Sequence, residues 1–167
     1  HLDLDDLLGQ DGLRVACGVA QGLALASDLP VIAVGTLAAM ALDSGGRQVI
    51  VTLDARMGEV YHALFVDGLA QTEVAVDAPD AVTLPGSTGW LACGNGLRQY
   101  PRLRERLANY VDRWLPDLIP DAGAVARLGA GGLARSEGVD AAAAAPIYVR
   151  NKVAQTVAER LANGGKA

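Results

Sequence analysis

The sequence predicts an α/β fold, and three features of its 167 residues indicate it. Residues 12–42 read as a buried helix, a short strand and a second helix. Between residues 48 and 76, three runs of alternating, β-branched residues are typical of an antiparallel meander. A further apolar strand at 90–94 leads into a charged helix at 97–108. Helical and strand signals mixed in this way predict one domain or two small α/β lobes.

The first helix, expected over residues 12–27, is apolar on almost all of its surface. Arg14 and Gln21 are its only large polar side chains. A helix with this pattern is buried on more than one side. Gly18 and Gly22 are four residues apart, a spacing that lets a second helix approach closely. That second helix belongs either to the same fold or to another chain, and the residues alone leave both alternatives open.

A short buried strand and a second helix follow the break at Pro30. The strand is expected at 31–35, and Thr36 is expected to cap a helix over 37–42. The glycine-rich loop at 43–47 ends this helix and is the predicted boundary between two lobes.

The meander is expected to consist of strands at 48–55, 59–66 and 69–76. Arg56, Met57 and Gly58 connect the first two, with the glycine supplying the unusual backbone conformation. A loop or short helix is expected before the strand at 90–94. The turn Gly94-Asn95-Gly96 then precedes the charged helix.

The last part of the chain contains one further capped helix. Asp121 is expected to cap a helix of small residues over 122–134. The alanines at 141–145 act as a spacer, and Pro146 introduces an extended segment at 147–150. A polar tail completes the sequence.

Composition excludes several classes of protein. Fourteen Lys and Arg against nineteen Asp and Glu give a net charge of −5, and an acidic chain does not hold a nucleic-acid backbone by itself. The apolar runs are shorter than the ~18 residues of a membrane span. The first ten residues lack the basic start of a secretory signal. Cys17 and Cys93 are expected to be buried, reduced thiols, which favours the cytoplasm.

The most pointed local pattern is the hairpin tip that carries Asp54, Arg56 and Glu59. Paired carboxylates can act as acid and base, and Asp54 could hold Mg²⁺ through water. The favoured interpretation is structural: Arg56 neutralises the two acids and stabilises the turn.

The other chemical candidates are weaker. Backbone amides of Gly94-Asn95-Gly96 could approach a phosphate, but a plain strand-to-helix turn is favoured because the glycine fingerprint and a phosphate-binding lysine are missing. His62 is expected to be a cross-strand or surface residue rather than a base. With only two histidines, a His-based metal site is excluded. One basic helix is the sole plausible RNA-facing patch and is interpreted as a solvated face: Arg98, Arg102, Arg104 and Arg106.

Three segments together resemble the bacterial TsaB (YeaZ) family. They are GLRVACGVAQGLALASDLPVIAVGTL at 12–37, DARMGEVY at 54–61 and PIYVRN at 146–151. The resemblance implies an actin-like (ASKHA, ribonuclease H-like) fold of two α/β lobes. It also implies a non-catalytic subunit that acts beside the catalytic subunit TsaD and the ATPase TsaE. Together these proteins transfer a threonylcarbamoyl group to the adenosine 3′ of the anticodon in tRNAs that read ANN codons.

Carried over to this chain, the resemblance assigns residues to two places. The first helix becomes a partner interface made of Arg14, Val15, Gly18, Val19, Gly22 and Leu23. The hairpin motif becomes a structural element made of Asp54, Arg56, Gly58, Glu59 and Tyr61. The implied domains are a remnant of the first lobe at 1–45, the second lobe at 46–153 and a C-terminal tail at 154–167.

The first lobe is expected to be incomplete here. The family's opening strand, which resembles AIDTS, and its Gly-Pro-Gly-Ser-Phe-Thr-Gly-like loop have no counterpart in this sequence.

Two other functions compete with the subunit role. An actin-like ATPase or small-molecule kinase would use Asp54 and the turn at 94–96, but needs phosphate loops from both lobes. A glycoprotease-type peptidase lacks a nucleophile with a base. The sequence therefore predicts no intrinsic cofactor, with ATP or ADP and Mg²⁺ only in an assembled complex. The expected partners are TsaD and TsaE, with tRNA reached through them; a homodimer is an alternative state, and no membrane is involved.

Overall fold

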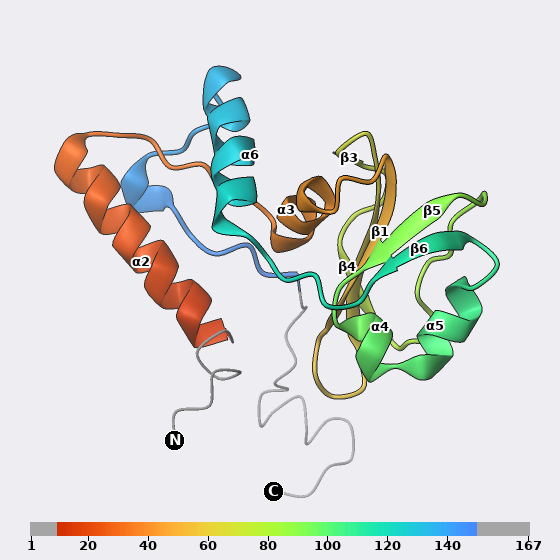
Figure 1. Cartoon of the computed structure of the whole chain (residues 1–167). Coiled ribbons are helices and arrows are strands. Elements are labelled where there is room, and N and C mark those ends of the chain that lie inside the picture. The colour runs from red at the N-terminus through yellow and green to blue at the C-terminus, as the bar shows by residue number, and fades with distance from the viewer. Residues whose placement is uncertain (1–9, 150–167) are drawn as a thin grey trace, which may run out of the picture.

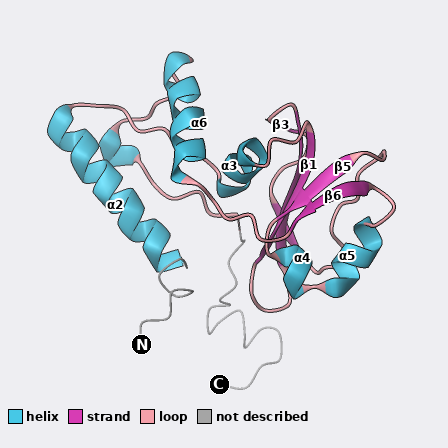
Figure 2. Cartoon of the chain, in the orientation of Figure 1, coloured by secondary structure: helices cyan, strands magenta, loops and turns pink. Residues whose placement is uncertain are grey.

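The computed structural model describes residues 10–149, which form one mixed sheet with helices on both faces and two helices to one side (Figures 1 and 2). The predicted tail at 154–167 lies outside the described residues, as do residues 1–9. The predicted division into lobes at residue 45 stays a prediction.

The centre of the sheet is β1 (Gln48–Asp54), a run of β-branched and apolar residues. It pairs antiparallel with β2 (Val60–Val66) and parallel with β5 (Trp90–Cys93). The final strand, β6 (Val111–Leu115), pairs parallel with β5 at the edge. The predicted hairpin is therefore confirmed, whereas β6 was not predicted, because two charged residues interrupt its short apolar run.

The third predicted strand, 69–76, is wrong as a single element. It is divided into β3 (Leu69–Ala70) and β4 (Ala75–Asp77), both of which pair with β2. Between them the Thr72 hydroxyl accepts the backbone N–H of Leu64 at 3.0 Å. A side chain thus takes the place of a strand carbonyl, and the regular ladder is interrupted there.

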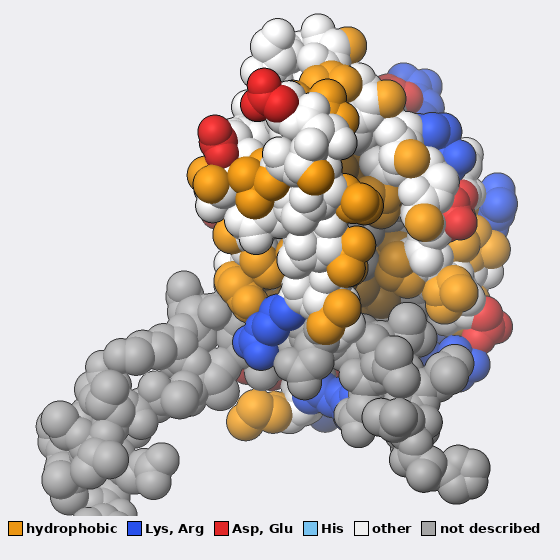
Figure 3. All heavy atoms as spheres, turned by 90° about the vertical axis from the view of Figure 1, so that its left-hand side faces the viewer, with side chains coloured by type: hydrophobic (Ala, Val, Ile, Leu, Met, Phe, Trp, Pro, Cys, Tyr) orange, Lys and Arg blue, Asp and Glu red, His pale blue; other side chains and the backbone are white. Residues whose placement is uncertain are grey.

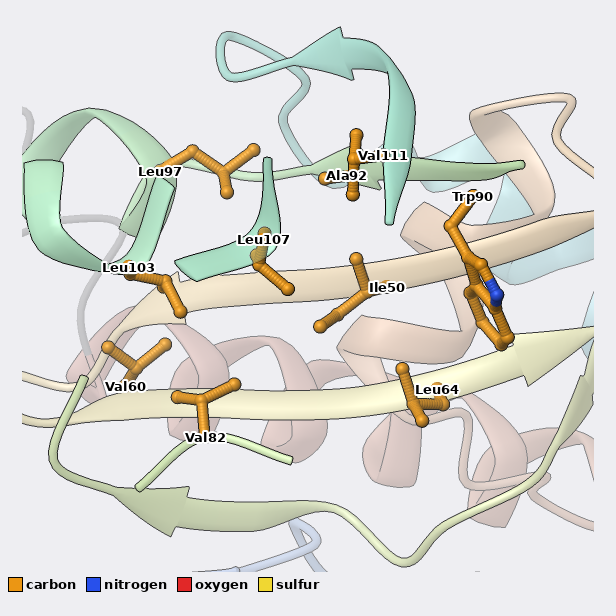
Figure 4. Packing of buried hydrophobic residues seen from close by; sticks show 10 residues of the cluster. All are labelled: Ile50, Val60, Leu64, Val82, Trp90, Ala92, Leu97, Leu103, Leu107 and Val111. Carbon is orange, nitrogen blue, oxygen red and sulfur yellow. The ribbon is translucent and has the colours of Figure 1, made fainter. Parts of the chain in front are cut away.

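Each face of the sheet buries its own apolar cluster. On one face, Ile50 and Val60 pack against Leu103 and Leu107 from the helical segment that follows β5 (Figure 4). On the other face, Val51 and Phe65 belong to the cluster of Met40, and they lie on the opposite side because strand residues alternate. The hairpin tip and the turn at 94–96 lie at the ends of strands of this sheet, whereas α2 lies to one side of it.

The charged helix predicted at 97–108 is two helices. They are α4 (Gly96–Gln99) and α5 (Pro101–Leu107), separated by Tyr100 in a non-helical conformation with φ −124° and ψ 88°. Proline disfavours helical geometry in the residue before it, and it suits the first turn of a new helix. Pro101 therefore ends α4 and begins α5.

Two helices lie beside the sheet in Figure 1: α2 (Gln10–Ser27) and α6 (Ala122–Ala134). Both confirm predicted helices, but the expectation that the first helix is buried on more than one side is wrong for the described residues, because Ala24 is its only buried residue between 12 and 27. Asp121 caps α6 as predicted, since its Oδ1 accepts the Ala124 N–H at 3.0 Å. α6 packs against α3 (Thr36–Asp43), which covers one face of the sheet. The predicted cap at Thr36 is wrong, because Gly35 occupies the N-cap position and makes no side-chain bond.

The strand predicted at 31–35 is also wrong. Among the described residues, only Val31 pairs there, in a single bridge with Val139. An apolar run becomes a strand only when a neighbouring backbone pairs with it, and residues 32–35 have no such neighbour within residues 10–149. The predicted alanine spacer begins with a short 3₁₀ helix, η1 (Ala141–Ala143).

Candidate partner interface

The outer face of α2 is an exposed apolar strip. We call the set Val15, Gly18, Val19, Gly22 and Leu23 the outer face. The three large side chains Val15, Val19 and Leu23 are 66%, 57% and 67% exposed, and their four-residue spacing places them in one row. Figure 3 views this side of the molecule, where hydrophobic side chains are spread over the surface with few charged side chains between them.

The two glycines keep this strip flat. A Cβ atom added at Gly18 or Gly22 would meet no atom within 4 Å. Their small size therefore serves no packing within residues 10–149. It leaves a shallow row on the helix into which another helix would fit closely, which favours the two-chain alternative left open by the sequence.

The inner face of α2 contacts the chain itself. Ala24 is buried, and the Gln21 side chain donates from Nε2 to the Ala142 carbonyl at 3.3 Å. Arg14 donates from Nε to the Tyr148 hydroxyl at 3.2 Å, and its guanidinium lies 6.0 Å from the centre of that ring. Arg14, one of the predicted interface residues, is thus turned toward its own chain, unlike the five residues of the outer face.

The structure joins the predicted hairpin tip to the turn at 94–96. The Tyr100 hydroxyl donates to Asp54 Oδ1 at 2.7 Å, and the Asp54 N–H donates to Asn95 Oδ1 at 2.9 Å. Asp54 Oδ1 also accepts the backbone N–H of Arg56 at 3.0 Å. Tyr100 and backbone groups hold Asp54, and the structural role of the hairpin motif stays a prediction. Tyr100 lies 46 residues away and no local signal identifies it.

The tip itself is a tight loop closed by backbone bonds. The Ala55 N–H donates to the Glu59 carbonyl at 2.9 Å, and the Glu59 N–H to the Arg56 carbonyl at 3.0 Å. Arg56, Met57 and Gly58 all have positive φ, of 62°, 54° and 79°, so the unusual conformation is not confined to the glycine. Tyr61 follows on β2 and packs against the Met40 cluster.

The glycines at 94 and 96 are required by close packing rather than by a phosphate. A Cβ at Gly94, where φ is +101°, would lie 2.2 Å from the Thr52 carbonyl oxygen, and one at Gly96 would lie 3.2 Å from Thr52. The Gly94 N–H donates to the Leu115 carbonyl at 3.1 Å. These contacts support the interpretation as a plain strand-to-helix turn.

His62 and the predicted basic patch are bound within the chain. His62 is buried, and its Nε2 lies 2.9 Å from Asp77 Oδ2 on β4, so the cross-strand interpretation is confirmed. The four arginines contact their own chain: Arg98 with Asp117, Arg102 with Asp80, Arg104 over Trp114, and Arg106 with the carbonyls of Pro79 and Val82. None of these contacts favours an RNA-facing patch.

The two cysteines differ in environment. Both are free thiols: the predicted burial is confirmed for Cys93 and wrong for Cys17, which is only half-buried because the described residues cover little of α2. Burial raises the pKa of the Cys93 thiol to about 12, because the thiolate would lose its hydration. Cys93 is therefore an unreactive thiol at neutral pH.

Residues 10–149 contain neither a metal-binding cluster of side chains nor a helix that could span a membrane. No group of three or more His, Cys, Asp or Glu side chains there is arranged to hold a metal ion, and no helix has both the length and the apolar character of a membrane span. A cavity of about 420 Å³ lies where β1, β5 and β6 begin, lined by residues 45–48, 89–91 and 112–113. It includes none of the predicted site residues.

Replacing Tyr100 by phenylalanine tests the Asp54 contact. Burial, together with the hydrogen bond and charge of Asp54 and the charge of Glu59, raises the pKa of Tyr100 from 10.0 to about 12. The folded chain therefore keeps this proton at pH values where the unfolded chain loses it. The resulting stabilisation is present below pH 10 and is lost as the pH rises through 12.

We expect Tyr100→Phe to lower the free energy of unfolding by about 1 kcal/mol at pH 8. The difference from wild type should then narrow between pH 10 and 12, where only the wild type loses the Tyr100 contribution. Urea unfolding of wild type and variant at pH 8 and at pH 12 measures the difference in the free energy of unfolding. In a titration followed by tyrosinate absorbance, the variant should lack the tyrosine that loses its proton near pH 12. An unchanged difference across that range would contradict the assignment.

Comparisons with known proteins point to one family. A family model described as TsaD, tRNA N6-adenosine threonylcarbamoyltransferase, matches residues 10–93. The tRNA threonylcarbamoyladenosine biosynthesis protein TsaB of Escherichia coli is 35% identical over 158 residues, which cover 86% of this chain and 67% of that protein. TsaB of Haemophilus influenzae is 46% identical over 59 residues, 33% of this chain and 25% of that protein.

Solved structures agree with these relatives. YeaZ from Pseudomonas aeruginosa superposes with a TM-score of 0.75 at 33% identity, over 84% of this chain and 70% of that one. A second Pseudomonas aeruginosa structure, of a protein with similarity to peptidase YeaZ, has a TM-score of 0.76 at 33% identity, over 85% and 69%. The fold class predicted from the sequence is thereby confirmed, and the chain belongs to the TsaB (YeaZ) family.

Proposed function

We propose that this chain is a non-catalytic partner subunit in the biosynthesis of threonylcarbamoyladenosine in tRNA, and that it binds the catalytic TsaD subunit through the outer face of α2. The observation that carries the proposal is the exposed row of Val15, Val19 and Leu23 beside two glycines with open space above them. A patch of this kind is unfavourable in water and marks an interaction surface.

Helix packing explains how the face would bind. Side chains of a partner helix would lie over Gly18 and Gly22, so that the two helix axes approach closely and the three large side chains leave water. Burial of such side chains contributes about 1.5–3 kcal/mol each. A second copy of this chain could use the same face, and a homodimer would then compete with the TsaD complex.

A non-catalytic role agrees with the chemistry of the described residues. Asp54, the strongest catalytic candidate, is occupied by Tyr100 and by the backbone of Arg56. The glycines of the turn at 94–96 pack on Thr52. Catalysis would then reside in TsaD, with TsaE as the ATPase, and this chain would reach tRNA, ATP or ADP and Mg²⁺ only in the assembled complex, in the cytoplasm.

Size-exclusion chromatography with light scattering tests the proposal. We expect the chain, mixed with TsaD of the same organism, to elute as a one-to-one or two-to-two complex. The chain alone should not hydrolyse ATP, which separates the subunit role from an actin-like ATPase. Failure of the chain to bind TsaD would refute the proposal, and ATP hydrolysis by the isolated chain would favour the ATPase.

A further inference from the structure

Within the described residues, α2 is held to the rest of the chain chiefly by the segment that follows α6. We call residues 138–148 the strap. It contains η1 and lies beside α2 in Figure 1, although it is more than 110 residues distant in the sequence. Ala24 is the only residue of α2 between 12 and 27 that is buried, so few other contacts fix the helix.

The strap begins on a firm anchor next to the end of α2. Val139 and Val31 exchange two backbone hydrogen bonds, of 2.9 and 3.0 Å. Gly138 lies so close to Pro30 that a Cβ there would be 2.7 Å from the proline Cβ. Asp140 then caps η1 by accepting the Ala142 N–H at 2.7 Å. This end of the strap is rigid because it is paired, packed and capped.

The strap meets α2 at two separate points. Gln21 donates to the Ala142 carbonyl, and Arg14 binds the Tyr148 hydroxyl and lies over its ring. Arg14 and Gln21 are seven residues apart, which is two helical turns or about 10 Å along the axis. One contact would let the helix pivot, whereas two contacts at this separation define its direction.

We propose that Tyr148 is a positioning residue, which fixes the direction of α2 through Arg14 and so presents the outer face at one angle. The effect on partner binding rests on the function proposed above. Arg14 is not part of the row of Val15, Val19 and Leu23, because the helical period turns it away from that row, and its side chain binds Tyr148. Loss of the contact would remove the hold of the strap on Arg14 in the N-terminal half of α2, while the contacts at Gln21 and Ala24 would remain.

Cys17 reports on this swing. It lies three residues after Arg14 and four before Gln21, so it shares their side of the helix, and it is half-buried. Cys93 is an internal control, since it is buried in the sheet with a pKa of about 12. The rate at which an aromatic disulfide reagent labels Cys17 in the native chain therefore rises when the inner face of α2 becomes more accessible.

We expect Tyr148→Ala to accelerate Cys17 labelling by about fivefold to thirtyfold, the effect of losing one hydrogen bond and one cation–π contact. Tyr148→Phe keeps the ring and should show a smaller increase. Ile147→Ala changes the neighbouring residue, which is 59% exposed, and should leave the rate unchanged. Cys93 should stay unlabelled in all variants, which shows that the sheet has not unfolded.

The affinity of the same variants for TsaD tests whether Tyr148 positions α2 for binding. Weaker binding by Tyr148→Ala, with partial recovery in Tyr148→Phe and unchanged urea unfolding of the sheet, supports it. An unchanged labelling rate in Tyr148→Ala overturns the proposal, and so does faster labelling with unchanged affinity. If the wild-type chain fails to bind TsaD, the proposed function is refuted instead, and the labelling rates still decide whether Tyr148 holds α2.

Discussion

Replacing Gly18 of α2 by leucine is expected to weaken binding to TsaD by about 100-fold or more, equivalent to about 2.8 kcal/mol. The leucine side chain would stand on the flat strip where a partner helix has to approach, and it would separate the two axes. Gly22→Leu should have the same effect, because both glycines lie on the outer face of α2. Titration calorimetry with TsaD measures the loss.

The same substitution should not damage the fold, which separates an interface effect from unfolding. A Cβ at Gly18 meets no atom within 4 Å, and glycine in a helix interior is about 1 kcal/mol less favourable than alanine. The variant is therefore expected to be as stable as the wild type or slightly more stable. If Gly18→Leu and Gly22→Leu fold and bind TsaD with unchanged affinity, the interface is not on this face.

Gly129→Leu is the matched control. Gly129 lies in α6, and a Cβ there also meets nothing within 4 Å. The change in side-chain size and helix propensity is identical, but the site is on another helix. We expect this variant to bind TsaD like the wild type, and a comparable loss of binding would show that bulky additions act without regard to position.

The largest loss of stability is expected for Gly94→Ala, at about 3–5 kcal/mol. The new Cβ would lie 2.2 Å from the Thr52 carbonyl oxygen, a backbone atom within the central strand, and the φ of +101° is itself unfavourable for alanine. The turn would have to move away from β1, and the Asp54–Asn95 and Asp54–Tyr100 contacts would be lost with it. Urea unfolding followed by circular dichroism measures the change.

Two further variants make this prediction specific. Gly96→Ala should cost less, because its Cβ would be 3.2 Å from Thr52 and no positive φ is required. Gly86→Ala should change stability by less than about 0.5 kcal/mol, since its Cβ meets nothing within 4 Å. Equal free energies of unfolding for Gly94→Ala and Gly86→Ala would mean that the turn at 94–96 is not packed tightly against β1. If Gly94→Ala is too unstable to purify, the test is whether Gly96→Ala loses more stability than Gly86→Ala.

The sequence alone was sufficient for elements whose signals are local. The helix predicted at 12–27 is a long apolar segment that ends before Pro30, the helix at 122–134 begins after its cap Asp121, and the β1–β2 hairpin joins two alternating runs through a tight turn. It failed where a proline or a distant partner intervened. Pro101 divides one predicted helix, and residues 32–35 form no strand because no backbone pairs with them in the described part of the chain.

For the candidate interface, too, the sequence predicted the local features and the tertiary structure decided the rest. The sequence determined which residues make α2 apolar and which small residues interrupt it, because a helical period places side chains on faces by geometry alone. Only the tertiary structure decided which face stays open: it turned Arg14 inward to Tyr148 and left Val15, Val19 and Leu23 exposed. Contacts between residues far apart in the chain depend on how the elements pack, and no local pattern records that packing.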